Sequence, residues 1–344
     1  MTNTVDVGIV GATGYTGEEL CSLLAGHPGV RVVSVTSRQH AGKSVTSVIP
    51  RLGRRAAWDA LTFIEPDIDA LLASDASFFF LALPHGQAAG FASALHAAGR
   101  RVLDLSADFR LRDASVYQEF YHDVHPAPEL LREAVYGLPE VYRDRIRDAR
   151  LVACPGCYPT SILIPLLPLL RGGLVETTGI HASCISGVSG AGRKAELTLL
   201  FAECNESVRA YGVPKHRHLS EIEQELSLAA REPVKLTFVP HLMPVTRGMH
   251  TTLFLNPLAG EFEVMRTLRA AYADEPFVRV GDALPDTKHV VGSNFCDVTS
   301  RLDLRTGSLM IFSAIDNLTK GAAGQAVQNF NIMAGFEETT GLRS

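Results

Sequence analysis

The chain lacks several features that would assign it to other classes of protein. No apolar stretch approaches the length of a membrane span. Lysine and arginine number 32 against 37 aspartate and glutamate residues, so no basic excess indicates a nucleic acid or an anionic membrane. No internal repeat and no low-complexity segment is found. We therefore expect neither a nucleic-acid partner nor a membrane partner.

The sequence also has little that indicates a metal site or disulfides. Cys154 and Cys157 form a Cys-x-x-Cys pair, but no second pair and no histidine at ligand spacing accompanies it. We therefore predict no metal site, while a dithiol redox pair stays open. Strand-like sequence starts at Val5, which leaves no room for a signal peptide. We expect a cytoplasmic protein whose 6 cysteines are reduced.

What the chain does have is enough length and apolar material for two domains. It contains 344 residues, of which 46% are hydrophobic and 20% charged. The first part alternates strand-like and helix-like segments, as doubly wound α/β domains do, and residues 117–150 look like a connection between domains. From residue 151 onward strands outnumber helices, which favours an α+β domain with a largely antiparallel or mixed sheet.

A glycine-rich turn joins a predicted strand at 5–10 to a predicted helix at 18–25. Its spacing is G-x-x-G-x-x-G rather than G-x-G-x-x-G. A strand, a glycine turn and a helix together favour a dinucleotide, whose pyrophosphate binds at the helix N-terminus, although such turns are often only structural. The candidate cofactor residues here are Gly11, Thr13, Gly14, Tyr15, Thr16 and Gly17.

The end of the second predicted strand, at 30–35, indicates which dinucleotide binds. NAD-specific sites usually carry Asp or Glu at this position. Here the strand runs into Thr36, Ser37 and Arg38. A hydroxyl and a guanidinium suit a 2′-phosphate, so Ser37 and Arg38 predict NADP, with a solvated arginine as the alternative.

Two further predicted strands, at 78–82 and 101–105, flank a predicted helix at 87–98. Carboxyl ends of parallel strands face the ligand crevice. Pro84 and His85 follow the first of these strands, and Arg110 follows the second. These side chains are candidates for the wall near the cofactor or substrate, or else have structural roles.

The most informative stretch is Pro155-Gly156-Cys157-Tyr158-Pro159-Thr160, which precedes an apolar run that reads as a helix. Pro159 suits the first helical turn, and a kink is expected at Pro165. A thiol at a helix N-terminus is stabilised as thiolate by the helix dipole and the free N–H groups. Cys157 is therefore a candidate nucleophile, the alternative being a buried, inert cysteine.

The second part of the chain predicts strands at 179–186, 235–239, 251–255 and 309–315 and helices at 220–230 and 263–273. The loop at 186–194 is rich in glycine and serine and ends in two cations, which suits a phosphate or a flexible surface loop. His216 and His218 precede a Ser220–Glu223 capping box, and could form an acid–base and anion-binding cluster or a solvated turn. Arg247 is a further anion-binding candidate.

These motifs together resemble the N-acetyl-γ-glutamyl-phosphate reductase family, which is related to aspartate-semialdehyde dehydrogenase. The resemblance spans nearly the whole chain. It rests on the stretches 11–17, 83–86, 106–110, 155–160, 186–192, 216–218 and 320–325.

The resemblance implies NADPH-dependent reduction of an acyl phosphate to an aldehyde. Cys157 would be the nucleophile and His218 the general acid/base, in a homodimer or homotetramer. It implies an NADP-binding Rossmann-type domain at 1–150, completed by the C-terminal helix 318–344, and a catalytic and dimerisation domain at 151–317. Further cofactor candidates are Gly187, Ser189, Gly190 and Asn317; the substrate candidates are Arg110, Ser186, His216 and Arg247.

Two alternatives remain at this point. The chain could reduce a related acyl phosphate, such as an aminoadipyl or aspartyl phosphate, because only the shape of the pocket separates these substrates. It could also be a non-catalytic NADP-binding redox sensor that uses Cys154 and Cys157. A redox sensor would depend on both cysteines, whereas the enzyme would depend on Cys157 alone.

Overall fold

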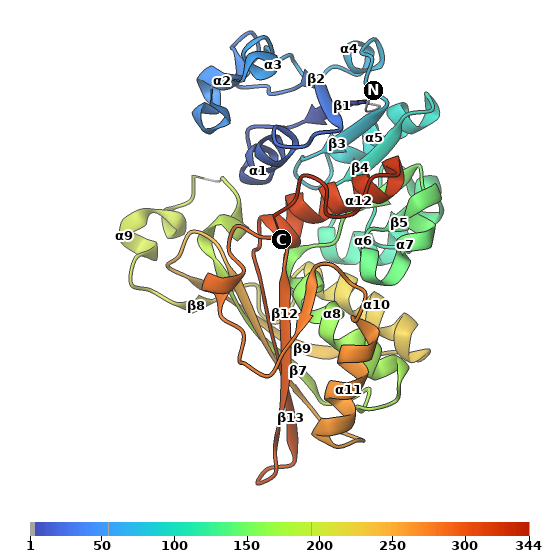
Figure 1. The fold of residues 1–344 in the computed structure, drawn as a ribbon, viewed down its shortest axis with the longest axis vertical. Helices are drawn as coiled ribbons and strands as arrows, with labels where there is room; N and C mark the ends of the chain where they lie inside the picture. The colour runs from blue at the N-terminus through green and yellow to red at the C-terminus, as the bar shows by residue number, and fades with distance from the viewer. Residues whose placement is uncertain (1–3, 54, 194, 344) are drawn as a thin grey trace. The chain divides into compact units, whose positions relative to one another are not determined.

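The structure is a computed structural model that describes residues 4–53, 55–193 and 195–343 (Figure 1). The chain divides into two compact units. The first unit comprises Met1–Pro155 and Ala322–Arg343, and the second comprises Gly156–Gly321. No helix among the described residues is long and apolar enough to cross a membrane.

The first unit is built on a parallel sheet. Among the described residues its strands pair in the order β2-β1-β3-β4-β6-β5, and every pair is parallel. The predicted strands near 5–10, 30–35, 78–82 and 101–105 are confirmed. Continuous apolar runs of this kind favour strands that are buried on both faces of the sheet. The bounds are β1 (Val5–Val10), β2 (Val30–Val35), β3 (Phe78–Leu81), β4 (Arg101–Asp104), β5 (Val135–Tyr136) and β6 (Leu151–Ala153).

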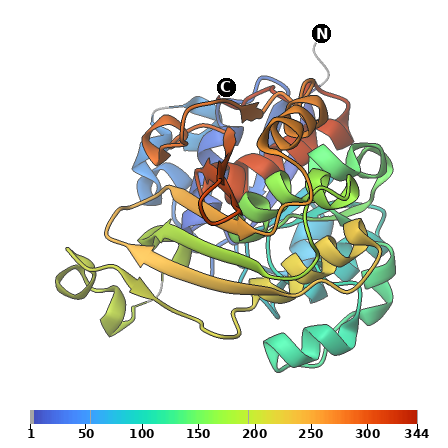
Figure 2. The same ribbon diagram turned by 90° about the horizontal axis from the view of Figure 1, so that it is seen from below.

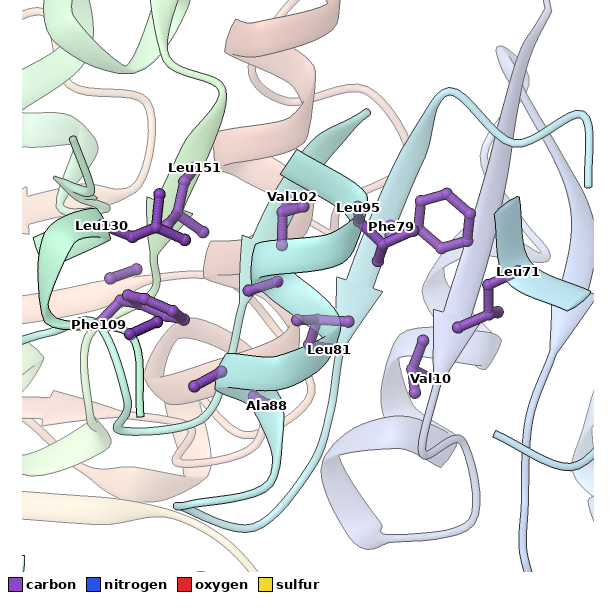
Figure 3. Close-up of a cluster of buried hydrophobic side chains, with 14 of the residues drawn as sticks. Val10, Leu71, Phe79, Leu81, Ala88, Leu95, Val102, Phe109, Leu130 and Leu151 are labelled. Atoms are coloured by element: carbon purple, nitrogen blue, oxygen red, sulfur yellow. The ribbon is translucent and has the colours of Figure 1, made fainter. Parts of the chain in front are cut away.

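Helices cover both faces of this sheet. On one face Leu95 of α5 packs with Phe79 and Val102 in the buried cluster of Figure 3. On the other face the ring of Phe330 lies 5.1 Å from the ring of Phe78. The predicted Rossmann-type α/β class is therefore confirmed. The helices of this unit are α1 (Tyr15–Leu24), α2 (Val45–Val48), η1 (Pro50–Leu52), α3 (Ala56–Asp59), α4 (Ile68–Leu72), α5 (Ala88–Ala97), α6 (Ala114–Tyr121), η2 (Pro128–Arg132), α7 (Pro139–Asp148) and α12 (Gly324–Ala334).

The interpretation of residues 117–150 as a connection is wrong. This segment belongs to the first unit and contributes most of α6, β5 and α7. β5 has only two residues, and α7 is mostly polar with Pro139 and Ile146 as its buried residues. Such short or weakly amphipathic elements leave little periodic signal in a sequence.

The second unit contains a mixed sheet. In the part of the chain that the structure describes, its strands pair in the order β11-β12-β13-β10-β7-β9-β8. β7 pairs with β9 in parallel, as the neighbouring green and orange-yellow strands of Figure 2 show, and β11 pairs with β12 in parallel. The predicted α+β class is confirmed. The strands are β7 (Ile180–Gly187), β8 (Arg209–Ala210), β9 (Leu236–Met243), β10 (Met249–Leu255), β11 (Val278–Val280), β12 (Cys296–Asp303) and β13 (Ser308–Ile315).

The main helices of the second unit pack beside this sheet (Figure 1). Along β10, Met249, Thr251 and Leu253 are buried, whereas His250 is half-buried and Phe254 is 38% exposed. The sheet therefore has one covered face and one partly exposed face within this unit. The helices are α8 (Cys157–Arg171), η3 (Val188–Ala191), η4 (Leu197–Leu199), α9 (Phe201–Cys204), α10 (His218–Ala230), α11 (Glu261–Ala271) and η5 (Thr287–His289), and the π-helical turn η6 (Thr319–Ala323) follows β13.

The predicted capping box at Ser220–Glu223 is wrong. α10 begins at His218, so Ser220 already lies inside the helix. The Ser220 hydroxyl donates to the carbonyl of Arg217 (2.8 Å) instead of accepting from the backbone. The backbone N–H of His218 instead donates to Nδ1 of His216 (3.1 Å), so an imidazole takes the capping role that the sequence suggested for a serine.

Candidate active site

Cys157 is the first residue of α8, and Gly156 is its N-cap with extended backbone angles (φ −70°, ψ 159°). Cys157 is partly exposed, whereas Cys154 is buried. Burial raises the pKa of the Cys154 thiol to about 12, so this thiol stays protonated near neutral pH. Of the Cys-x-x-Cys pair, only Cys157 thus combines access with the N-terminal end of a helix.

His218 lies directly against the residue that precedes Cys157. A Cβ atom built on Gly156 would come within 2.5 Å of Nε2 of His218, so only glycine leaves room for the ring. The backbone N–H of Gly156 donates to Oε1 of Glu221 (2.9 Å), and Glu221 is 1% exposed. α10 therefore brings His218 and a buried carboxylate to the N-terminus of α8.

His216 is held as a neutral acceptor beside this pair. Its ring centroid lies 4.9 Å from that of His218, and its Nδ1 accepts the backbone N–H of His218. Burial, assisted by the charge of Arg217, lowers the pKa of His216 to about 4. With Nδ1 engaged and a depressed pKa, His216 is suited to orienting its neighbour at neutral pH.

Aromatic side chains surround the two histidines. The hydroxyl of Tyr211 donates to the hydroxyl of Tyr158 (3.0 Å), and the ring of His216 lies 5.8 Å from that of Tyr158 and 5.5 Å from that of Phe238. Tyr158 follows Cys157 in α8. The cluster therefore fixes the start of α8 relative to the segment that leads into α10.

The loop at 186–190 is an ordered structure held by backbone hydrogen bonds. The N–H groups of Gly187, Val188 and Ser189 donate to the carbonyls of Gly248, Val245 and Thr246 (2.9, 2.9 and 3.1 Å). A Cβ on Gly187 would lie 2.8 Å from Cα of Arg247, so glycine permits this close approach. Ser186 and Ser189 are buried. Lys194, the second cation noted in this loop, lies outside the described residues.

Arg247 and Asn317 are joined to this loop through the residues that follow β13. Nε of Arg247 pairs with the carboxylate of Asp316 (2.8 Å), which is fully buried. Nδ2 of Asn317 donates to Oγ of Ser189 (2.9 Å), and a Cβ on Gly190 would lie 3.8 Å from that nitrogen. The second unit thus assembles the candidates Ser186, Gly187, Ser189, Gly190, Arg247 and Asn317 into one hydrogen-bonded and packed region.

The glycine-rich turn of the first unit has the close packing that dinucleotide sites require. Gly11 has φ +87°, and a Cβ there would lie 2.6 Å from the carbonyl oxygen of Ala82. A Cβ on Gly17 would lie 2.5 Å from the carbonyl oxygen of Gly11. A Cβ on Gly14, the N-cap of α1, would meet no atom within 4 Å, so its approach is open. Tyr15 and Thr16 begin α1, earlier than the predicted start at residue 18.

This turn meets two further candidate regions. Oγ1 of Thr13 lies 3.1 Å from Oγ of Ser37, which is buried, whereas Arg38 is exposed. β1 also pairs with β3, so the carboxyl ends of these strands place the turn beside Pro84 and His85. In doubly wound sheets, ligands bind where the chain connections of two neighbouring strands run in opposite directions along the sheet, as those of β1 and β3 do.

Asp108 orders the loop that contains Pro84 and His85. This fully buried carboxylate accepts the backbone N–H groups of Gly86 (2.6 Å), Ala88 (3.0 Å) and Ala89 (3.0 Å) at the start of α5. The guanidinium of Arg110 donates to the carbonyl of Cys154 (2.8 Å) and to that of Leu105 (3.0 Å). Arg110 therefore holds the chain shortly before it reaches Cys157.

Sequence reasoning missed three carboxylates in these regions, Asp108, Glu221 and Asp316. Each is buried and accepts backbone N–H groups. Each lies in or near a stretch that the sequence analysis singles out (106–110, 216–223 and 320–325), and this was the only available signal, because a carboxylate that binds distant amides has no spacing pattern of its own. Within the described ranges, no group of three or more His, Cys, Asp or Glu side chains could hold a metal ion.

Two families match the two units. Residues 6–149 match the family described as semialdehyde dehydrogenase, NAD binding domain, and residues 157–317 match semialdehyde dehydrogenase, dimerisation domain. Aspartate semialdehyde dehydrogenase II of Vibrio cholerae, complexed with ASA, shares the fold with a TM-score of 0.72 at 17% identity, covering 96% of this chain and 98% of that one. The enzyme of Candida albicans with NADP gives a TM-score of 0.69 at 15% identity, with the same coverage. These matches define a semialdehyde dehydrogenase with a nicotinamide dinucleotide-binding domain.

Closer relatives narrow this class. The N-acetyl-gamma-glutamyl-phosphate reductase of Akkermansia muciniphila is 54% identical over 98% of both chains. That of Alkalilimnicola ehrlichii is 52% identical, again over 98% of both. The chain belongs to the N-acetyl-gamma-glutamyl-phosphate reductase family, so the resemblance inferred from the motifs is confirmed.

Proposed function

We propose that the chain reduces N-acetyl-L-glutamyl 5-phosphate with NADPH to N-acetyl-L-glutamate 5-semialdehyde and phosphate, a step of arginine biosynthesis. The observation that carries the proposal is the packing of His218 against Gly156 at the start of the helix that Cys157 begins. A thiol nucleophile requires an acid/base nearby, and this packing places His218 beside the residue that precedes Cys157. The identity to the reductases of this family supports the substrate.

Cys157 carries the acyl group in this mechanism. Its thiolate attacks the acyl carbon, a C–S bond forms, and the bond to phosphate breaks with phosphate leaving with the electron pair. A thioester on Cys157 remains. The positive end of the α8 dipole, where Cys157 lies, would stabilise the negative charge that develops on the carbonyl oxygen.

His218 handles the proton. A nicotinamide cofactor held by the glycine-rich turn would supply the hydride that reduces the thioester carbon, and Cys157 would then carry a thiohemiacetal oxyanion. Protonated His218 stabilises this oxyanion and can exchange a proton with it. When the oxyanion collapses, the C–S bond breaks, the aldehyde is released and Cys157 regains its thiolate. His216 keeps the N-terminal amide of α10 in place through Nδ1 during these steps.

The cofactor residues we propose are those of the glycine turn, together with Pro84, His85 and three residues of the loop at 186–190, Gly187, Ser189 and Gly190. The closeness of Gly11 and Gly17 to neighbouring backbone supports this, since larger residues would fill the cradle. Ser37 and Arg38 support NADP over NAD, because a hydroxyl and a guanidinium can bind the 2′-phosphate. Asn317 and Ser189 join the same set through their hydrogen bond.

The substrate carries anionic groups for which we propose partners. We assign its phosphate to Ser186 and the neighbouring loop, with Arg247 beside it. Arg110 and His216 complete the proposed substrate set. Arg110 also donates to two backbone carbonyls, so it shapes the path of the chain ahead of Cys157.

A homo-oligomer is the assembly we propose, with a homodimer as the minimal unit and a homotetramer as a pair of dimers. The matched dimerisation domain and the partly exposed sheet face that bears Phe254 support it. We place the reaction in the cytoplasm, where the thiol of Cys157 stays reduced. Light scattering of the purified chain should give an even number of copies, and a monomer would refute this assignment.

The reverse reaction tests the function. N-acetylglutamate semialdehyde, phosphate and NADP should give NADPH, and omission of phosphate should abolish it. Aspartate semialdehyde, an aminoadipate semialdehyde and NAD serve as controls, and activity with one of them alone would move the assignment to a related acyl phosphate or cofactor. The Cys157→Ser variant should bind NADP but not turn over. A Cys154→Ser variant that matters as much as Cys157→Ser would favour the redox sensor.

A further inference from the structure

Asp316 is a buried carboxylate that the proposed mechanism does not use. It follows β13 directly and has no exposure to solvent. Its Oδ1 accepts the backbone N–H groups of Leu318 (2.8 Å) and Thr319 (3.3 Å). Its Oδ2 accepts the N–H of Gly292 (2.6 Å) and pairs with Nε of Arg247 (2.8 Å). One side chain therefore joins three segments of the second unit.

The first consequence concerns the wall behind Cys157. The carbonyl of Asp316 accepts the N–H of Gly321 (2.9 Å), which closes the turn at 316–321. Gly321 lies against the nucleophile: a Cβ built there would be 2.7 Å from Cβ of Cys157 and 3.2 Å from its Cα. The turn runs into the π-helical residues Thr319–Ala323, a conformation often found at functional sites. The turn that Asp316 stabilises therefore packs directly on Cys157.

The second consequence concerns the loop at 186–190. Oδ1 of Asn317 accepts the N–H of Gly248 (2.8 Å), while its Nδ2 donates to Oγ of Ser189 (2.9 Å). Nη2 of Arg247 donates to Oγ1 of Thr319 (3.0 Å). The turn that begins at Asp316 is thereby fixed to the loop that we assign to the phosphate of the substrate.

We propose that Asp316 is a positioning residue of the active site, which holds Gly321 against Cys157 and Asn317 against Ser189. This inference rests on the proposed function of Cys157. Buried hydrogen bonds around a charged group are strong and cooperative, so the network has one preferred arrangement. Its loss would release the wall of the nucleophile and the phosphate loop together.

The test is the Asp316→Asn variant. An amide nitrogen in place of Oδ2 would face the N–H donor of Gly292 and the positive charge of Arg247, so the network cannot close. Two rates are measured: kcat of the phosphate-dependent reverse reaction, and alkylation of Cys157 by iodoacetamide, followed by mass spectrometry. We expect kcat to fall about 100-fold, because a misplacement near 1 Å has this effect. We expect alkylation to become faster, because Gly321 no longer confines the thiol.

General destabilisation would lower kcat and would also expose the buried thiol of Cys154, so faster alkylation confined to Cys157 separates positioning from unfolding. Asp297→Asn is the matched control. Asp297 lies on β12 of the same unit, and its carboxylate pairs with Arg279 (2.6 Å). Removing this carboxylate should leave both rates at their wild-type values. If Asp316→Asn does not fold, Thr319→Val removes the hydroxyl that accepts from Arg247 and should change both rates in the same directions, by less.

A folded Asp316→Asn or Thr319→Val enzyme with wild-type kcat and wild-type alkylation would overturn the proposal. So would a lowered kcat with unchanged alkylation, because Gly321 would then not depend on Asp316. The alkylation assay needs no substrate. If the wild-type chain fails to turn over N-acetylglutamate semialdehyde, the proposed function fails, while faster alkylation in Asp316→Asn still supports the positioning of Cys157.

Discussion

Replacing Gly156 with alanine perturbs the candidate acid/base by a single methyl group. The backbone angles of Gly156 are ordinary for alanine (φ −70°, ψ 159°), so the substitution introduces no backbone strain. The new Cβ would instead lie 2.5 Å from Nε2 and 2.8 Å from Cε1 of His218. Carbon contacts favour about 3.5 Å or more, so the ring must move by about 1 Å.

A displacement of this size should be visible mainly in turnover. We expect kcat of Gly156→Ala to fall about 100-fold, equivalent to about 2.7 kcal/mol of transition-state stabilisation. Overpacking should lower the free energy of unfolding by about 1–3 kcal/mol, which leaves the variant folded in a protein of ordinary stability. Steady-state kinetics in the reverse direction and thermal unfolding measure the two effects, and NADP binding should be unchanged.

Gly90→Ala is the control for a methyl group added without a neighbour. Gly90 lies in α5, and a Cβ there meets no atom within 4 Å. It should keep wild-type kcat and gain up to about 1 kcal/mol of stability from helix propensity. A misplaced catalytic group costs far more than a factor of about two in kcat. If kcat of Gly156→Ala stayed within that factor of the wild-type value, His218 would not act from the position that the structure gives it.

Three further predictions follow from the buried groups. Glu221→Ala leaves the N–H of Gly156 without its acceptor, so it should lower the free energy of unfolding by about 1–3 kcal/mol in chemical denaturation and also lower kcat. Glu221→Gln keeps an acceptor and is the control. Equal stability of the two variants would contradict this role of Glu221. Asp108→Ala should raise KM for NADPH more than it lowers kcat, because the loop with His85 loses its anchor, and an unchanged KM would count against that role. The pKa of His216 is about 4 in the fold against about 6.5 unfolded, so its stabilising contribution is present above pH 6.5 and is lost as the pH falls toward 4. His216→Asn keeps an acceptor that does not titrate. Over that pH range, its free energy of unfolding should fall by up to about 3 kcal/mol less than that of the wild type in pH-dependent denaturation. Parallel curves for the two proteins would refute the assignment.

The sequence predicts secondary structure best in segments where a single local signal is present. β1 and β2 have the predicted bounds because short apolar runs between turn residues leave no competing structure. α8 was predicted from Pro159 and the apolar residues after it, and it continues through Pro165 and Pro168 within its assigned span. The capping box failed because Ser220 has a competing acceptor, the carbonyl of Arg217.

The arrangement of the candidate site depended on long-range packing that one sequence does not reveal. Cys157 and His218 were predicted as separate motifs, but the contact of His218 with Gly156 appears only once α8 and α10 are packed together. Glu221 lies 65 residues from the amide that it accepts. Asp316 likewise gains its partners from segments far apart in the chain, so nothing in its local sequence distinguishes it from a strand-end aspartate.

The central claim is that Cys157 carries the acyl group, and a trapped intermediate tests it most directly. The protein would be mixed with N-acetylglutamyl phosphate in the absence of NADPH, quenched in acid and analysed by peptide mass spectrometry. We expect an N-acetylglutamyl adduct on the peptide that contains Cys157, lost on treatment with hydroxylamine and absent from Cys157→Ser. No adduct under conditions that support turnover, or an adduct on another residue, would contradict the thioester mechanism.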